Sequence, residues 1–348
     1  MPAKSARAKS GRKKYWKDVQ SKSKTKKRNK LALAVLGILV GILIIGWLIN
    51  FTQSLFKPFN NAGSSAGNYQ KKYSWDGSFN INLVIRTKNI SLLSYNPTKG
   101  SIIILNIPDE TFLELPNGFG KWQLRAIYDF GQTQGLGGDK LLKESLSSFF
   151  AVPIDGFLDL SASGVTSAEV IETLRKNPLS GYGLLSALKT DLTMWELLKF
   201  KMNISAVRFD KIKELNLDKL SVLQKDNLPD GSFVFISDPS ILDSVLGDLV
   251  DPKIVSEHKT IAVLNATDKP QLAQKWARLI TNLGGNVIIT GNAPERLEKT
   301  QVFGEQSFTL KRLRQIFAPD DKISSSEGVM GSSRAQINVL IGEDYIDK

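Results

Sequence analysis

The sequence predicts an α/β protein in which one apolar N-terminal helix precedes two layered domains. Three observations lead to this prediction: an uncharged run lies behind a basic tail, strand-like and helix-like patterns then alternate, and a second, shorter alternation closes the chain. Alternating strands and helices are typical of layered α/β domains. The 348 residues are sufficient for two such domains.

The positive charge is concentrated at the N-terminus. Residues 1–30 contain 13 Lys or Arg and one acid, Asp18, so this tail alone accounts for the net charge of +12. The run Leu31–Ile49 is uncharged, and as a helix it would span about 28 Å, close to the roughly 30 Å hydrocarbon core of a bilayer. A cleaved signal peptide is the alternative, but its apolar region is shorter, about 7–15 residues. We therefore expect an uncleaved membrane anchor.

Short segments rich in Lys and Arg remain in the cytoplasm. The predicted location is therefore the cell membrane, crossed once, with a cytoplasmic N-terminus and the folded domains outside. Because membrane topology explains the basic tail, no nucleic-acid partner is predicted. Gly37 and Gly41 have the GxxxG spacing of dimerising helices, but glycine is frequent in membrane helices, so helix dimerisation is not favoured.

Several classes of active site are excluded. The chain has no cysteine, which rules out disulfides, thiol nucleophiles and thiolate metal sites. No HExxH or GxxxxGK motif occurs. The "GQTQG" segment resembles a nucleophile elbow with Thr133 as the nucleophile, but a helical pattern precedes it. The single histidine, His258, lies between the two predicted domains, and we expect it to be an exposed linker residue.

The first domain is predicted from strands and helices in alternation. Phe79, Ile81, Leu83 and Ile85 alternate as one face of a strand, and "ISLLSY" and "SIIILNI" are the next strands, joined by the turn "NPTKG". After the glycine-rich loop "PNGFGKW", the helix "QLRAIYDF" is expected to stop at Gly131. "DKLLKESLSSFF" predicts a helix with Asp139 as its N-cap, and "PIDGFLDL" a further strand.

The second domain is predicted after the linker "DPKIVSEHK". "TIAVLNAT", "KPQLAQKWARLITNLGG" and "NVIITGNA" form a strand–helix–strand unit, with Gly284 and Gly285 ending the helix. "TQVFG", "SFTLKRLRQIF" and "AQINVLIGEDY" repeat the pattern, so two βαβ-like units are expected. "SSSEGVMGSS" is predicted to be a loop, and "KRLRQ" at Lys311–Gln315 a solvated helix face. The predicted divisions are a tail at 1–30, a transmembrane helix at 31–50, a flexible stalk at 51–74, and domains at 75–253 and 258–348.

Several motifs in order resemble the LytR–CpsA–Psr family. They are "SYNP" at Ser94–Pro97, "IPDET" at Ile107–Thr111, "AIYDFG" at Ala126–Gly131 and "VPID" at Val152–Asp155. "VLNAT", "GNA" and "VLIGEDY" in the second block resemble the LytR C-terminal domain. The resemblance implies a membrane-anchored protein outside the cytoplasmic membrane that joins lipid-linked glycopolymers to the cell wall. In this family, arginines hold the polyprenyl pyrophosphate and acids hold Mg²⁺.

The sequence departs from the family pattern at the positions that carry this chemistry. Arg86 keeps a family arginine, but Lys88 stands where the metal-binding aspartate is expected. Asp109 replaces a phosphate-binding arginine, Glu110 keeps an acid, and Arg125 occupies an asparagine position. These five residues are the candidate ligand-binding residues, and Mg²⁺ is expected only if catalysis is retained. The interpretation in which Asp109 and Glu110 form a solvated turn is favoured over retained catalysis.

The resemblance and its departures together predict a non-catalytic or strongly diverged LytR–CpsA–Psr-like protein. It would act in cell-envelope assembly by binding a lipid-linked glycan, a wall polymer or an assembly partner. One alternative is an active phosphotransferase that joins polyprenyl-pyrophosphate-linked glycopolymer to the wall, and another is an envelope-related regulatory protein. Phe149, Phe150 and Phe157 either line a groove for a polyprenyl chain or pack in the core, and core packing is favoured.

Overall fold

The computed structural model describes residues 36–50, 52, 55, 73–176, 182–317 and 334–346. The chain divides into two compact units, Met1–Lys57 and Pro58–Lys348. In the first unit residues 36–50 are helical. Of the helices in the described part of the chain, none combines the length and the apolar character that a membrane crossing requires. The predicted tail, the start of the apolar run, nearly all of the predicted stalk and the whole of the predicted "SSSEGVMGSS" loop lie outside the described residues.

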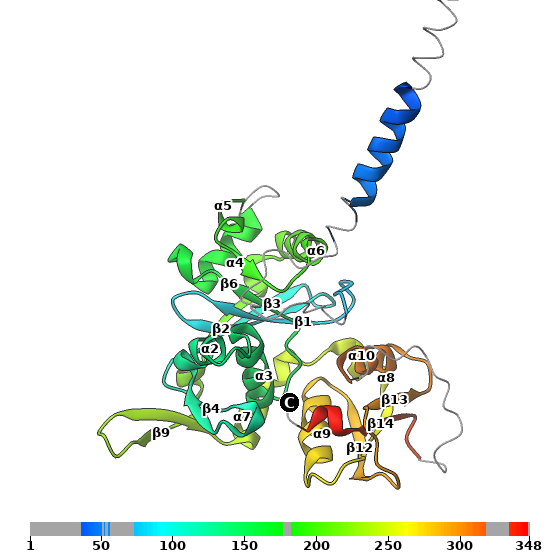
Figure 1. The fold of residues 1–348 in the computed structure, drawn as a ribbon. Coiled ribbons are helices and arrows are strands. Elements are labelled where there is room, and N and C mark those ends of the chain that lie inside the picture. Colours follow the sequence, from blue (N-terminus) through cyan, green and yellow to red (C-terminus); the bar gives the residue numbers. More distant parts are fainter. Residues whose placement is uncertain are drawn as a thin grey trace, which may run out of the picture. The chain divides into compact units, whose positions relative to one another are not determined.

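The second unit contains a six-stranded mixed sheet, in the order β7-β6-β1-β2-β3-β8 (Figure 1). The first three strands in the sequence form an antiparallel meander, with the predicted turn between β2 and β3. β6 runs parallel to β1, and β8 runs parallel to β3. The strands are β1 (Ile81–Arg86), β2 (Ile90–Asn96), β3 (Ser101–Ile107), β6 (Gly156–Asp159), β7 (Lys189–Thr190) and β8 (Ile212–Asn216).

Helices cover both faces of this sheet, because side chains alternate between two cores. One core joins Val84, Leu92 and Leu105 to α2 (Leu124–Thr133) and α3 (Gly138–Phe150). The other joins the neighbouring strand residues to α4 (Ser167–Lys176) and α6 (Met194–Ser205). In Figure 1 the two helix pairs lie on opposite sides of the sheet. The predicted layered α/β architecture is therefore present.

Two predictions about α2 and α3 were wrong. α2 continues past Gly131 to Thr133, and the N-cap of α3 is Gly137 rather than Asp139, which lies in the first turn. The glycines are needed for close packing of the two helices instead. A Cβ on Gly138 would lie 2.4 Å from the backbone oxygen of Tyr128, and one on Gly131 would lie 2.9 Å from the Cα of Gly138.

Several helices and strands lie in segments for which the sequence predicts no regular structure. The predicted glycine-rich loop contributes a short hairpin, and a second hairpin precedes a helix that packs against α3. The additional elements are β4 (Phe112–Glu114), β5 (Lys121–Gln123), α5 (Tyr182–Leu185), β9 (Leu223–Asn227), β10 (Phe233–Ser237) and α7 (Pro239–Val245).

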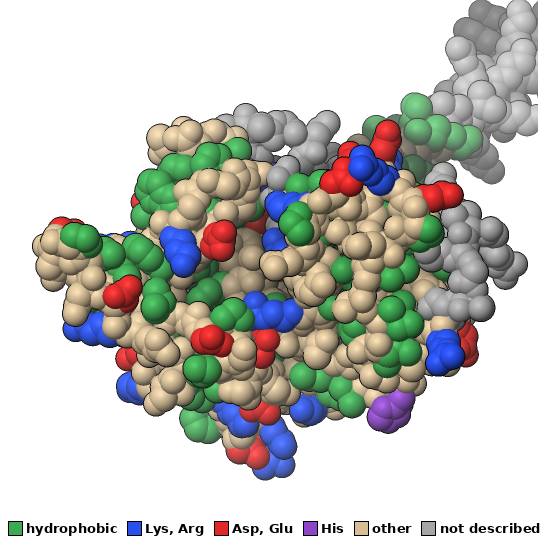
Figure 2. Space-filling view, turned by 90° about the horizontal axis from the view of Figure 1, so that it is seen from below, with side chains coloured by type: hydrophobic (Ala, Val, Ile, Leu, Met, Phe, Trp, Pro, Cys, Tyr) green, Lys and Arg blue, Asp and Glu red, His purple; other side chains and the backbone are tan. Residues whose placement is uncertain are grey.

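A four-stranded sheet forms the C-terminal part, in the order β12-β11-β14-β13. β11 (Thr260–Asn265), α9 (Leu272–Asn282) and β12 (Asn286–Asn292) make the expected parallel βαβ unit. The prediction of a second βαβ-like unit is wrong. β13 (Gln301–Gly304), α10 (Phe308–Phe317) and β14 (Ile337–Ile341) follow one another in the sequence, but the two strands pair antiparallel, whereas a βαβ unit has parallel strands. The predicted linker forms α8 (Pro252–Glu257), and His258 is exposed at its end, as expected (Figure 2).

Buried polar contacts join the two α/β parts within the second unit. Arg312 of α10 forms an ion pair with Asp155, which precedes β6, with Nη2 2.7 Å from Oδ1. Tyr73 donates a hydrogen bond to the same carboxylate, and the backbone N–H of Asn82 donates to its other oxygen. The prediction of a solvated face at Lys311–Gln315 is therefore wrong at Arg312, which is 0% exposed.

Candidate site at the strand ends

The candidate site begins where the parallel strands β1 and β6 end. Arg86 is the last residue of β1, and the register pairs it with Asp159, the last residue of β6. The two side chains meet, with Nη1 of Arg86 3.0 Å from Oδ2 of Asp159, and the same nitrogen lies 3.1 Å from the hydroxyl of Ser161. Asp159 is 4% exposed. A nearly buried carboxylate therefore already compensates the charge of Arg86.

The helix α2 supplies two further contacts to Arg86. The guanidinium carbon lies 4.0 Å from the ring centre of Tyr128, a cation–π contact. Nη2 lies 3.8 Å from Oδ1 of Asp129. Burial is the largest of the effects that raise the pKa of the Tyr128 hydroxyl, and Asp159 adds to it. These contacts hold the guanidinium group in one orientation. The Arg86 side chain is nevertheless 24% exposed.

Asp109, Glu110 and Arg125 lie together at the end of β3. Burial raises the pKa of Asp109, Glu110 raises it further, and Arg125 lowers it. The backbone is also fixed here, because the N–H of Arg125 donates to the carbonyl oxygen of Asp109 over 3.2 Å, and the N–H of Phe235 donates to that of Glu110 over 3.1 Å. The turn is thus half-buried and tied to α2 and β10. Asp109 and Glu110 are both partly exposed, so the turn is partly solvated.

Lys88 stands apart from this group. It is exposed in the turn between β1 and β2. Its charge helps to lower the pKa of Glu169 on α4, after the larger effect of the backbone and side-chain hydrogen bonds with Thr166. The structure thus brings Asp109, Glu110 and Arg125 together and places Arg86 with Asp159, while Lys88 faces a different helix.

The strand-end residues do not fit a magnesium site. Mg²⁺ requires oxygen ligands from one or more carboxylates in octahedral geometry. Asp159 is bonded to Arg86, and Lys88 occupies the position of the expected aspartate. Within the described ranges, no group of three or more His, Asp or Glu residues is placed to hold a metal ion.

The phenylalanines proposed for a lipid groove pack in the core instead. Phe150 and Phe157 are each 0% exposed in the core under α2 and α3, and Phe149 packs against its rim. The ring of Phe157 also stacks on Tyr128 at 5.8 Å, below Arg86. Core packing, the favoured alternative, is confirmed for these side chains.

Sequence reasoning missed the partners that define the site. Asp159, Tyr128 and Asp129 all contact Arg86, yet only their positions inside the "AIYDFG" and "PIDGFLDL" segments were noted. The signal for Asp159 was its position in "DL" at the end of the predicted strand "PIDGFLDL". A carboxylate at the end of a strand lies beside the end of a parallel neighbouring strand, which here carries Arg86.

Comparison with known proteins supports an envelope role. Residues 259–345 match the family model described as LytR cell envelope-related transcriptional attenuator. The polyisoprenyl-teichoic acid–peptidoglycan teichoic acid transferase TagU of Oceanobacillus iheyensis is 30% identical over 79 residues, which are 23% of this chain and 24% of that protein. The match thus spans about a quarter of the length of that relative.

Two solved structures are similar at lower identity. B. subtilis TagT has 14% identity and a TM-score of 0.37, over 56% of this chain and 97% of that one. The LytR-CPS2A-psr family protein YwtF (TagT) with bound octaprenyl pyrophosphate lipid has 13% identity and a TM-score of 0.36, over 51% and 92%.

The family match and the TagU relative place the chain among cell-envelope proteins with a LytR-type C-terminal segment. The predicted resemblance to the LytR–CpsA–Psr family is confirmed by the family model over residues 259–345 and by the similarity to TagU.

Proposed function

We propose that this protein acts in cell-envelope assembly by binding an envelope glycan, without transferring a phosphoryl group. It is anchored by the apolar segment Leu31–Ile49, with its two α/β parts outside the cell membrane. The family relationship and the composition of the N-terminal tail support this location. The TagU relative is named for transfer of teichoic acid to peptidoglycan, which supports a lipid-linked glycan or wall polymer as the ligand class.

One observation carries the non-catalytic part of the proposal. Arg86 is bonded to Asp159 and faces Asp129, while Asp109 and Glu110 add two further acids at the same sheet edge. A pyrophosphate bound at Arg86 would meet the carboxylates of Asp159 and Asp129, and one bound at Arg125 would meet those of Asp109 and Glu110. At 4 Å each charge pair is worth about 4 kcal/mol at an effective dielectric constant near 20. The balance of charge therefore opposes a pyrophosphate.

A second candidate function is phosphotransfer by a rearranged site. The partial exposure of Arg86 and the position of Arg125 beside Asp109 favour it, because both guanidinium groups are at the edge where the resemblance places the pyrophosphate. Phosphoryl transfer needs cations to offset the charge of the phosphates. This candidate thus requires that the two arginines outweigh the neighbouring acids.

A binding and turnover assay separates the two candidates. The full chain in detergent micelles is mixed with a polyprenyl-pyrophosphate-linked glycan and Mg²⁺ or Mn²⁺. Binding is followed together with the release of polyprenyl monophosphate, the leaving group when the glycan phosphate passes to water or to an added wall-polymer acceptor. We expect binding without release. Metal-dependent release that disappears in Arg86→Ala would overturn the non-catalytic proposal, and absence of any glycan binding would overturn the envelope-glycan role.

A further inference from the structure

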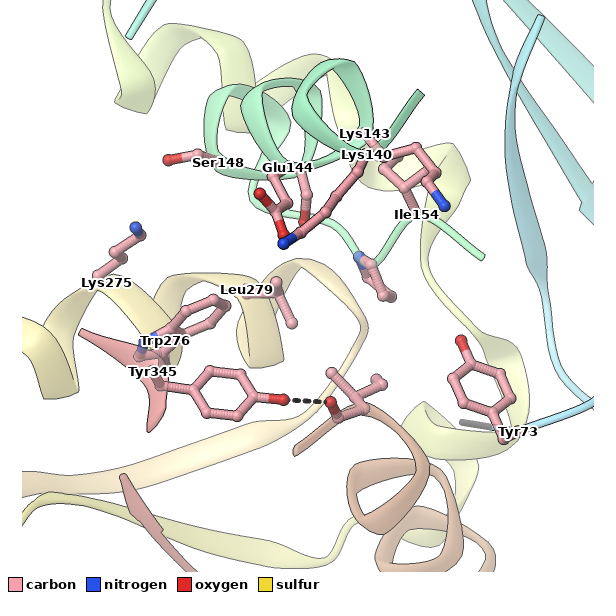
Figure 3. A pocket seen from close by; sticks show the side chains of 13 residues that line it. Tyr73, Lys140, Lys143, Glu144, Ser148, Ile154, Lys275, Trp276, Leu279 and Tyr345 are labelled. Carbon is pink, nitrogen blue, oxygen red and sulfur yellow. Dashed lines mark hydrogen bonds between the residues drawn. The ribbon is translucent and has the colours of Figure 1, made fainter. Parts of the chain in front are cut away.

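A cleft lies between α3 of the first α/β part and α9 of the second. Two cavities, of about 200 Å³ and about 940 Å³, have Ser147, Ser148, Lys275, Trp276 and Leu279 in both linings, so they adjoin. In Figure 3, Lys140 and Glu144 extend from α3 opposite Trp276 and Leu279 of α9. Binding sites commonly occupy clefts of about 300–1,000 Å³ at domain interfaces. The cleft therefore has the size and position of a ligand site.

Hydrogen bonds on one side of the cleft fix its walls. Arg278 of α9 donates to both carboxylate oxygens of Asp243 on α7, over 2.8 and 2.7 Å, and also to the carbonyl oxygen of Phe149 at the end of α3. Asn282 donates to Asp243 and to the carbonyl oxygen of Phe150. With the Arg312–Asp155 ion pair elsewhere in the same interface, these contacts hold α3 and α9 at a set separation. A preorganised cleft loses less entropy when a ligand binds.

The charged side chains of the cleft favour an anion with widely spaced charges. Three lysines, Lys140, Lys269 and Lys275, line it beside two acids, Glu114 and Glu144. Lys143 and Arg278, which also belong to the lining, form ion pairs with Asp191 and Asp243. Lys269 donates a hydrogen bond to the carbonyl oxygen of Ile346, and the amine of Lys275 lies 5.2 Å from the ring centre of Trp276. Burial lowers the pKa of Lys275, and Lys269 lowers it further, whereas both acids raise it. A bound anion near Lys269 and Lys275 would offset the repulsion between the two amines.

The start of α9 adds further positive potential. Gln271, the N-cap residue, makes no side-chain capping bond, and Gln271 and Leu272 both line the larger cavity. The first N–H groups of a helix attract anions. The rest of the lining offers hydroxyl and amide groups, including Ser148, Asn117 and Gln274. In addition, Trp276 is 7% exposed and its Nε1 has no partner in the described structure.

We propose that the cleft between α3 and α9 binds a glycan or polyol polymer that carries phosphodiester groups. Such a ligand has many hydroxyl groups and few, separated negative charges, which is the combination that the lining offers. The inference rests on the envelope-glycan role proposed above and deepens it, because it assigns the polymer to this cleft and not to the strand ends.

The test uses the full chain in detergent micelles and a fluorescent poly(glycerol phosphate) oligomer, with binding followed by fluorescence anisotropy. We expect the Lys269→Ala/Lys275→Ala variant to bind about tenfold or more weakly, because it removes two positive charges from the cleft lining. Lys299→Ala is the matched control, since Lys299 is an exposed lysine of the same α/β part outside the cleft lining. Its affinity should be unchanged. A neutral maltooligosaccharide should bind more weakly than the charged oligomer, and the difference should shrink with added salt.

In this assay the inference is overturned by no binding of the oligomer, by equal losses in the cleft variant and Lys299→Ala, or by equal affinity for the neutral oligosaccharide. Equal melting temperatures of the variants and the unmodified chain verify that folding is retained. The lipid-linked glycan assay described above distinguishes the two proposals. If the chain binds the lipid-linked glycan equally well with and without the two lysines, the cleft is not the site and the envelope-glycan role stands.

Discussion

Arg312 and Asp155 form the most deeply buried ion pair that joins the two α/β parts among the described residues, with side chains 1% and 0% exposed. Burial alone would lower the pKa of Arg312, but Asp155 and Tyr73 outweigh it and raise the pKa. The same burial raises the pKa of Tyr73. We predict that Arg312→Met lowers the free energy of unfolding by about 3–5 kcal/mol, because it leaves Asp155 buried without its partner. Chemical denaturation of the full chain measures this.

The neighbouring residue provides the control. Lys311 pairs with Asp76, but its side chain is 56% exposed, so Lys311→Ala should change the free energy of unfolding by less than about 1 kcal/mol. The double variant Asp155→Leu/Arg312→Met should be less destabilised than the sum of the two single changes. Equal effects of Arg312→Met and Lys311→Ala would show that the buried pair does not determine the stability of the interface.

The contact between α2 and α3 gives a second prediction. Gly138→Ala places a Cβ 2.4 Å from the backbone oxygen of Tyr128, so it should lower the free energy of unfolding by about 1–3 kcal/mol. Gly247→Ala is the matched control, because Gly247 is exposed and its added Cβ meets no atom within 4 Å. The melting temperatures of both variants, compared with that of the unmodified chain, measure the two effects. A Gly138→Ala variant as stable as the control would mean that the two helices separate without cost.

The sequence predicts the local pattern well and the long-range partners poorly. The alternation through Ile81, Leu83 and Ile85 identifies one face of β1, because the period of a strand is two whatever its neighbours are. Arg312 shows the limit. The "KRLRQ" pattern is polar, and its burial depends on Asp155, which is 157 residues away. The direction of β13 is likewise set by its pairing with β14 and not by its own residues.

The candidate site shows the same limit. Arg86 was identified from a motif, but its bond to Asp159 arises from the parallel register of β1 and β6, which no local pattern contains. Similarly, the raised pKa of Asp109 depends mainly on burial, in a turn whose next residue, Glu110, accepts a hydrogen bond from the unpredicted strand β10. The cleft between α3 and α9 was missed entirely, because its two walls come from different α/β parts.

Asp76 gives a prediction about acid stability. Burial raises the pKa of this carboxyl, but hydrogen bonds from Ser78 and Lys311 outweigh it and lower the pKa from 3.8 to about 2. A carboxyl with a lowered folded-state pKa stabilises the fold above its unfolded pKa, and the stabilisation is lost as the pH falls. Stability should therefore decline from pH 3.8 to about pH 2, and less steeply in Asp76→Asn. Chemical denaturation at several pH values measures the slope, and parallel curves would contradict the prediction.

The strand-end charge gives the last prediction. Asp109→Arg replaces an acid at the position that the resemblance assigns to a phosphate-binding arginine, so it should tighten the binding of a polyprenyl pyrophosphate by about tenfold or more. Asp218→Arg is the control, because it makes the same change of charge at an exposed position. The affinity of each variant is measured in detergent micelles at two salt concentrations. Equal gains in both variants would indicate a general effect of net charge. No gain in Asp109→Arg would mean that the acids at this sheet edge do not control pyrophosphate binding, and the argument from charge against phosphotransfer would fail.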